Sequence, residues 1–127
     1  MKKLLPILLL AIIVPALMVG CSKYVSHYSA MMLVTEQSSK AGSINFSSFS
    51  GNKVFTLKSD GHLNYSAKLE EGSATVYYDD GKKVELFSIR GGEEIRPSSI
   101  NVGSGTVYVI VQTNEKCKDG KFSFDVK

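Results

Sequence analysis

The chain has 127 residues, 43% of them hydrophobic, with 15 Lys and Arg against 12 Asp and Glu, two Cys and no Trp. This length allows one domain, and a charge so close to balance excludes nucleic acid as a partner, because nucleic-acid-binding domains carry a clustered basic face. Two cysteines are also too few for the disulfide framework of a small secreted protein.

The first twenty residues have the composition of a secretory signal peptide. Two lysines follow the first Met, residues 4–19 are apolar, and the small residue Gly20 stands before Cys21. The apolar run is shorter than the about 20 residues that a membrane-spanning helix needs. We therefore predict a signal peptide over residues 1–20 and an exported protein.

The segment Leu17-Met18-Val19-Gly20-Cys21 resembles the lipobox of bacterial lipoproteins, with Met18 where that pattern usually has Leu. The resemblance implies that the leader is cut before Cys21 and that a diacylglycerol is joined to the Cys21 sulfur. The resemblance also implies that the protein is associated with a membrane through this lipid, either the cell membrane or the outer membrane. The alternative is an ordinary leader, cut near Gly20, that leaves a free cysteine.

Residues 21–29 are predicted to form a lipidated tether. Ser22 to Ser29 is short and polar and lacks helical or sustained strand periodicity. Eight residues reach at most about 27 Å when extended, so the folded part is expected close to the lipid surface. His27 has no other His or Cys at ligand spacing and is predicted to be solvated, as is His62 beside a turn.

From Ala30 onward the sequence alternates with the period of β-strands. In Leu63 to Leu69, every odd-numbered residue is apolar or aromatic and every even-numbered one is polar, and Phe122 to Val126 repeats the pattern. No stretch has helical periodicity. The alternating runs predict about eight strands, over residues 31–36, 43–49, 53–59, 62–70, 73–79, 83–90, 105–113 and 121–126.

Turn signals separate the predicted strands. The pairs Asp60-Gly61, Asp80-Gly81 and Asp119-Gly120 each predict a hairpin, because a type I′ turn needs positive φ at its central residues. Glycines predict further turns at residues 50–52, 71–72 and 91–92.

Many short strands with regular turns predict an all-β fold, an antiparallel β-sandwich of the jelly-roll kind over residues 30–127. In residues 83–90 the alternation changes phase, which predicts a bulge near Phe87 and Ser88. Pro97 removes a ladder donor, so residues 94–102 are predicted to be an edge or a crossing connection. The predicted core is Phe46, Phe55, Leu57, Leu63, Tyr65, Ala67, Leu69, Val76, Val84, Leu86, Val107, Val109, Val111, Phe122 and Phe124.

The stretch from Lys53 to Val126 resembles bacterial pre-peptidase C-terminal domains and their carbohydrate-module relatives. The resemblance rests on the order of the alternating strands and on the late segments Gly105-Thr-Val-Tyr-Val-Ile-Val and Gly120-Lys-Phe-Ser-Phe-Asp-Val. It implies a small jelly-roll sandwich, and it bears on the fold rather than on the function.

The sequence offers little for catalysis, and we predict that the protein is not an enzyme and needs no cofactor. Hydrolysis by a side-chain nucleophile requires a base in reach, and the two histidines lie in the predicted tether and at a turn. Acidic pairs at residues 70–71, 79–80 and 93–94 could bind calcium together with Asp60 or Asp119, but their spacing is not that of a calcium loop, and solvated acids beside turns are the simpler interpretation.

Cys117 is the second cysteine, between Lys116 and Lys118. Two lysine charges would lower the pKa of a thiol, so a reactive thiol is one interpretation. A loop cysteine without a role is the other, and the one we favour.

The outward aromatic side chains give the predicted binding face. If Val107, Val109 and Val111 point into the core, then Tyr108 and Ile110 point outward, with Tyr77 beside them. Such a patch suits a sugar or a protein partner. The alternative, which we favour, is that the N-terminal segment around Met31, Met32 and Leu33 covers the patch. We therefore predict a lipid-anchored binding or accessory module that contacts an envelope protein or glycan. The alternative is an envelope protein that inhibits or scaffolds a secreted hydrolase through a loop at residues 91–101.

Overall fold

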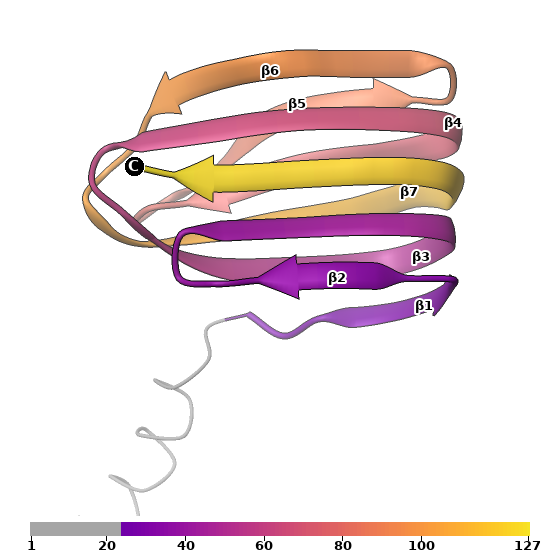
Figure 1. Cartoon of the computed structure of the whole chain (residues 1–127), viewed down its shortest axis with the longest axis horizontal. Helices are drawn as coiled ribbons and strands as arrows, with labels where there is room; N and C mark the ends of the chain where they lie inside the picture. Colours follow the sequence, from indigo (N-terminus) through magenta and orange to yellow (C-terminus); the bar gives the residue numbers. More distant parts are fainter. Residues whose placement is uncertain (1–23) are drawn as a thin grey trace, which may run out of the picture.

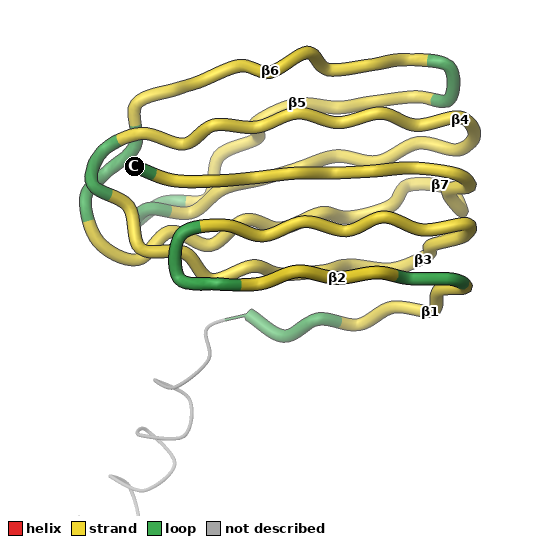
Figure 2. Tube along the Cα trace, in the orientation of Figure 1, coloured by secondary structure: helices red, strands yellow, loops and turns green. Residues whose placement is uncertain are grey.

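The computed structural model describes residues 24–127, in which all regular structure is β-strand. Within this range no helix has the length and apolar character needed to cross a membrane. Figures 1 and 2 show two stacked layers of antiparallel strands, which confirms the predicted sandwich. The strands are β1 (His27–Met31), β2 (Val34–Gln37), β3 (Ala41–Ser59), β4 (His62–Asp79), β5 (Lys83–Arg90), β6 (Glu93–Asn101) and β7 (Gly105–Val126).

The three longest strands, β3, β4 and β7, each run through both layers. Residues 41–49 of β3 pair with residues 117–125 of β7 in one layer, and residues 52–59 pair with residues 105–112 in the other. The pairing of β4 with β7 changes layer in the same way. Each long strand therefore bends at a corner, and the corners lie together at the right of Figure 1.

We name the two layers the front sheet and the back sheet. The front sheet has the order β2-β3-β7-β4-β6 and uses the first halves of β3 and β4 and the second half of β7. The back sheet has the order β1-β3-β7-β4-β5 and uses the other halves. Both sheets thus share one folded set of strands, as in a jelly roll.

The predicted strands are in place, but several predicted turns are not turns. Six of the eight predicted strands are halves of β3, β4 and β7, so the glycine breaks at residues 50–52 and 71–72 are corners at which the strand continues. The predicted strand over residues 31–36 is divided between β1 and β2, with Met32 at a φ of 52° between them.

One of the three predicted hairpins is confirmed, at Asp80-Gly81 between the paired strands β4 and β5. Asp60-Gly61 is a turn, but it connects β3 to β4, which are separated by β7. The hairpin at Asp119-Gly120 is wrong, because both residues lie inside β7. A Cβ on Gly120 would lie 2.7 Å from Phe46 Cζ, so this glycine allows β7 to pack closely against the inside of the sandwich.

The predicted bulge in residues 83–90 and the predicted edge at residues 94–102 are both present. In β5, Leu86 has no partner between Glu85 and Phe87, so the bulge lies one residue before its predicted place. Strand β6 is an edge strand of the front sheet, where three residues from Ile95 to Pro97 face two of β4. The proline therefore lies at a bulge of an edge strand, where its missing N–H breaks no ladder.

The tether predicted over residues 21–29 is corrected from Tyr24 onward, since His27–Met31 is strand β1 and Tyr24 packs on the sandwich. The predicted signal peptide and Cys21 lie outside the described residues. Strand propensity alone missed β1 because His27 to Ser29 is polar and its only sheet neighbour is the bent part of β3.

The core lies between the two sheets and is aromatic at its centre. Phe122 stacks at 6.2 Å from Phe46 and 6.4 Å from Phe87, measured between ring centroids. Twelve of the fifteen predicted core residues are buried, whereas Tyr65 and Leu86 are half-buried and Val84 is 38% exposed at the edge of β5. The core residues that the prediction missed are Ile44, Phe49, Ala74, Ile89, Cys117 and Val126.

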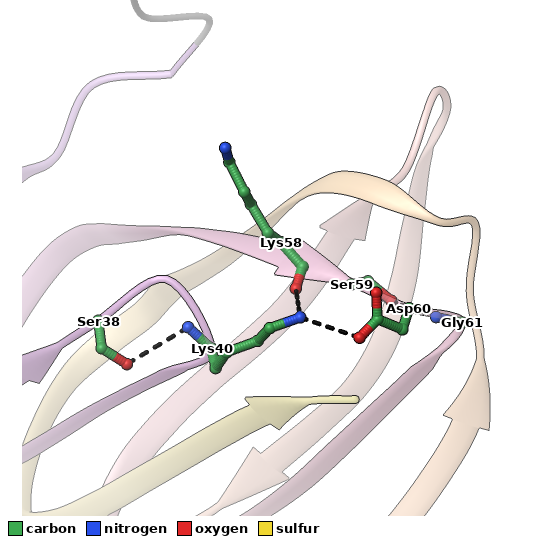
Figure 3. A network of polar contacts seen from close by, with 6 residues as sticks. All are labelled: Ser38, Lys40, Lys58, Ser59, Asp60 and Gly61. Carbon is green, nitrogen blue, oxygen red and sulfur yellow. Dashed lines mark hydrogen bonds and ion pairs between the residues drawn. The ribbon is translucent and has the colours of Figure 1, made fainter.

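A polar network closes the end of the sandwich opposite the corners (Figure 3). The Lys40 ammonium donates to the Lys58 carbonyl oxygen at 2.9 Å and pairs with an Asp60 carboxylate oxygen at 3.1 Å. The Gly61 amide donates to Ser59 Oγ at 2.8 Å. The ion pair is exposed and contributes at most about 1 kcal/mol. The Lys58 side chain extends away from this network.

Candidate binding surfaces

The outer face of the front sheet is polar along three adjacent strands. Because β7 lies between β3 and β4, Lys121 has Asn45 on one side and Lys68 on the other. The next row of outward positions is entirely serine: Ser43, Ser123 and Ser66. Hydroxyl, amide and ammonium groups therefore share one surface, with the short serine side chains in its middle.

Three adjoining hollows lie on this face, and we refer to them together as the front groove. The first, of about 450 Å³, and the second, of about 240 Å³, share Lys68 and Lys121 in their walls. The third, of about 470 Å³, shares Pro97 with the second and extends to Asn64 and Asp125. The groove thus crosses the front sheet from β2 to β6, with polar side chains in every hollow and apolar ones such as Met32, Val34 and Ile95 among them.

The charges of the front groove are mixed. Lys68 and Lys121 are directly opposite one another on neighbouring strands, an arrangement that is unfavourable for like charges in an isolated sheet. Glu70 lies 3.9 Å from the Lys68 ammonium, and Glu94 is the β6 neighbour of Lys68. The groove therefore presents hydrogen-bond donors and acceptors side by side, and its electrostatic potential is not of a single sign.

The predicted binding residues Tyr77, Tyr108 and Ile110 lie together on the outer face of the back sheet. Ile110 is the register partner of Tyr77, and the two neighbouring strands carry these side chains on the same side. Ile110 is only 4% exposed, and both tyrosines are half-buried. The Lys83 ammonium lies 4.5 Å from the Tyr77 ring centroid. The three residues are adjacent, and little of their surface is open to a ligand.

Tyr24 occupies part of this face. Its ring meets Tyr108 edge to face at a centroid distance of 5.2 Å, and its hydroxyl donates to an Asp79 carboxylate oxygen at 2.6 Å. Asp79 is 3% exposed and also accepts a hydrogen bond from the Gly81 amide. The N-terminal segment thus covers the aromatic face that the sequence pointed to.

Cys117 is a core residue and not a loop cysteine. It is fully buried in β7, and its Sγ lies 3.5 Å from the Ser73 carbonyl oxygen. Its pKa is raised to about 11, mainly by burial; a hydrogen bond with the Ser73 backbone lowers the pKa and the Glu115 charge raises it, both by less than burial does. The predicted lowering by Lys116 and Lys118 is therefore wrong, because desolvation of the thiolate outweighs two solvated lysines.

The Cys117 thiol should react slowly in the folded protein. At pH 7 we expect a thiol reagent to label it about 100-fold more slowly in the native state than in denaturant, since reaction needs an opening that exposes the thiol. Because the native thiol keeps its proton above its ordinary pKa of 9.0, stability should be unaffected below pH 9 and should fall between pH 9 and 11. Equal labelling rates in both states would contradict the burial.

The acidic residues considered for calcium are separated by the fold. Asp60 pairs with Lys40, the Asp80 carboxylate accepts a hydrogen bond from the Gly103 amide, and Asp79 is engaged by Tyr24. In residues 24–127, no three His, Cys, Asp or Glu side chains are grouped as metal ligands would be.

The segment over residues 91–101 is not a projecting loop, which corrects the prediction that it could reach into a hydrolase. Gly91 and Gly92 form a turn whose amides donate to the carbonyl oxygens of Gly72 and Leu69 at 2.8 and 2.7 Å. The rest is β6, paired with β4. The predicted loop over residues 91–101 is therefore wrong, whereas inhibition or scaffolding of a hydrolase stays a prediction.

The front groove was missed at the sequence level, although its residues were visible there. Asn64, Ser66 and Lys68 are the polar positions of an alternating run, and Lys121, Ser123 and Asp125 are those of another. Alternation shows that such positions face outward, but not that β4 and β7 are neighbours.

Comparison with protein-family models and with curated proteins finds no match. Among solved structures, the chain is similar to protein NMB1881 from Neisseria meningitidis, at 13% identity and a TM-score of 0.41 over 78% of this chain and 86% of that one. It is also similar to TmCBM61, solved in complex with β-1,4-galactotriose, at 17% identity and a TM-score of 0.41 over 79% and 83% of the two chains. A cupin-2 domain protein from Shewanella frigidimarina matches at 10% identity and a TM-score of 0.35 over 78% and 83%. These similarities concern the fold alone.

Proposed function

We propose that this protein is a non-enzymatic binding module of the cell envelope, exported and held on a membrane by lipid at Cys21, with the front groove as its ligand site. The observation that carries the proposal is the groove itself, three adjoining hollows on one sheet face, two of which share Lys68 and Lys121. The lipobox-like segment before Cys21 supports the anchor.

The polarity of the groove favours a glycan as its ligand. A sugar chain presents hydroxyl groups that both donate and accept, and the groove offers serine hydroxyls, amides, ammonium groups and carboxylates in alternation. Its length across the front sheet suits an extended chain. The apolar side chains of the lining, Met32 and Val34 at the β2 end and Ile95 and Pro97 beside β6, flank a centre of serine and lysine side chains.

The chemistry of the described residues supports binding rather than catalysis. The side chains that line the front groove include no His or Cys. The Cys117 thiol is buried with a raised pKa, so it is a poor nucleophile at neutral pH. We therefore propose that the groove holds its ligand without changing it.

The test is co-sedimentation of the detergent-solubilised protein with isolated cell-wall glycan. In the double variant Lys68→Ala/Lys121→Ala we expect binding to weaken about tenfold or more, because a charge-assisted hydrogen bond contributes about 1.5–3 kcal/mol.

The matched control is Lys58→Ala/Lys83→Ala, which removes the same charge from other surfaces and should bind as the native protein does. Equal weakening in both double variants would show general charge attraction and would contradict a ligand site in the groove. If the wall glycan does not bind but an envelope protein is retained through Lys68 and Lys121, the groove is a protein site and the glycan proposal is wrong.

A further inference from the structure

Exposed apolar side chains gather on one edge of the sandwich. In residues 24–127, six large apolar side chains are exposed, and five of them lie between Val25 and Val34. Val25, Met31, Met32 and Val34 are 61–79% exposed. They belong to β1 and β2 and the chain beside them, the N-terminal edge, which is the lower edge in Figure 1. Both sheets end on this side of the molecule, so the apolar side chains span the edge of the whole sandwich.

This edge lacks the devices that keep exposed strands from pairing with other chains. Edge strands are normally protected by charges, proline or bulges. The opposite edge has all three: six charged residues in β5 and β6, Pro97, and a bulge in each strand. In residues 24–37 the only acidic or basic side chain, histidine aside, is Glu36. The contrast indicates that the N-terminal edge is covered in the functional protein.

The position of Cys21 indicates what covers it. Only two residues lie between Cys21 and Tyr24, so the distance between them is at most about 10 Å. Tyr24 is held by Tyr108 and Asp79, and the Val54 amide donates to Ser26 Oγ at 2.9 Å, so the start of the edge is fixed to the sandwich. A lipid at Cys21 therefore brings this edge, rather than a distant part of the domain, to the bilayer.

We propose that the N-terminal edge lies on the lipid surface to which Cys21 is joined, with Val25, Met31, Met32 and Val34 in the boundary between headgroups and acyl chains. This inference rests on the proposed lipid anchor. Lipid contact covers the exposed apolar groups and shields the open edges of β1 and β2, as amphipathic segments do at membrane interfaces. Met32 and Val34 also line the β2 end of the front groove, so the membrane lies against that end, while the part from Lys68 to β6 stays open to a ligand beside the membrane.

The experiment places a fluorescent probe on each edge of the full-length lipidated protein in phosphatidylcholine and phosphatidylglycerol vesicles. The variant Met32→Cys carries an environment-sensitive dye on the N-terminal edge. Val84→Cys, the one exposed large apolar residue of the opposite edge, is the matched control. The buried Cys117 should not take up the dye. We expect the Met32 probe to emit at shorter wavelength and to lose about half its fluorescence to a quencher on the lipid acyl chains, and the Val84 probe to remain as in water.

The outcomes separate the inference from the anchor. Protein that floats with the vesicles while both probes remain as in water overturns the membrane contact and leaves the anchor intact. Protein that stays out of the vesicles overturns both. A Met32 probe that emits at shorter wavelength but is not quenched by the lipid also overturns the inference, and indicates that a second copy of the chain covers the edge.

Discussion

Replacing Gly72 by Ala should strongly destabilise this protein. A Cβ at Gly72 would overlap the backbone carbonyl oxygen of Lys116 and lie 2.8 Å from the Cys117 Cα, because the corner of β4 crosses the corner of β7 there. Neither neighbour is a flexible side chain that could move away. The residue also has a φ of +98°, where an L side chain is strained by about 1–3 kcal/mol. We expect the free energy of unfolding to fall by about 4 kcal/mol or more, measured by denaturant unfolding.

Gly81→Ala is the control that separates strain from overlap. Gly81 has a φ of +136°, and a Cβ there would meet no atom within 4 Å. Its substitution should cost only the backbone strain, about 1–3 kcal/mol. If the two variants lost the same stability, the close crossing of the corners would be refuted.

Replacing Cys21 by Ala should abolish the incorporation of radiolabelled palmitate into the protein. The proposed anchor joins its acyl chains through this one sulfur, and each buried methylene contributes about 0.8 kcal/mol to membrane partition. Two chains suffice for stable anchoring. Because both are joined through the Cys21 sulfur, the loss of the palmitate label should be complete. Metabolic labelling followed by isolation of the protein gives a direct reading.

Cys117→Ala is the matched control, since it removes the second cysteine of the chain. Cys117 is fully buried in β7, so its loss should leave the palmitate label in place. Label that follows Cys117, or a native protein that takes up none, would rule out the anchor.

The anchor, the N-terminal edge and the front groove fit one arrangement. Tyr24 holds the chain against the back sheet three residues after Cys21, and the groove opens on the front sheet. In the proposed arrangement, the edge from Val25 to Val34 would face the lipid. The predicted aromatic face at Tyr108 then contributes to fixing the N-terminal segment. A long flexible tether is not required.

Individual strands were predictable because alternation reflects a local property. Residues 62–70 and 73–79 show which side chains face the core, since a strand with one buried face must place apolar groups at every second position. The core residues were predicted from the same alternation. The prediction was wrong where a residue alternates like a core residue but lies at the edge of a sheet. Val84 alternates correctly but lies at an edge, where no second sheet covers it.

Connections were less predictable, because a glycine signals a change of backbone direction without specifying the partner. Gly72 and Gly81 are alike in sequence context, yet one is a corner inside β4 and the other ends a hairpin. The neighbouring strands decide between these outcomes, and at Gly72 the deciding neighbour is Lys116 of β7, more than forty residues further along the chain.

The sequence by itself determined that the residues from about 30 onward form an antiparallel β-sandwich, which residues face its core, and that Cys21 follows a lipobox-like segment, because periodicity and short motifs are local. Only the tertiary structure decided that Lys68 meets Lys121, that Tyr24 covers Tyr108 and that Cys117 is buried. Each of these depends on β7 lying between β3 and β4, a pairing of distant segments that is set by the packing of the whole core.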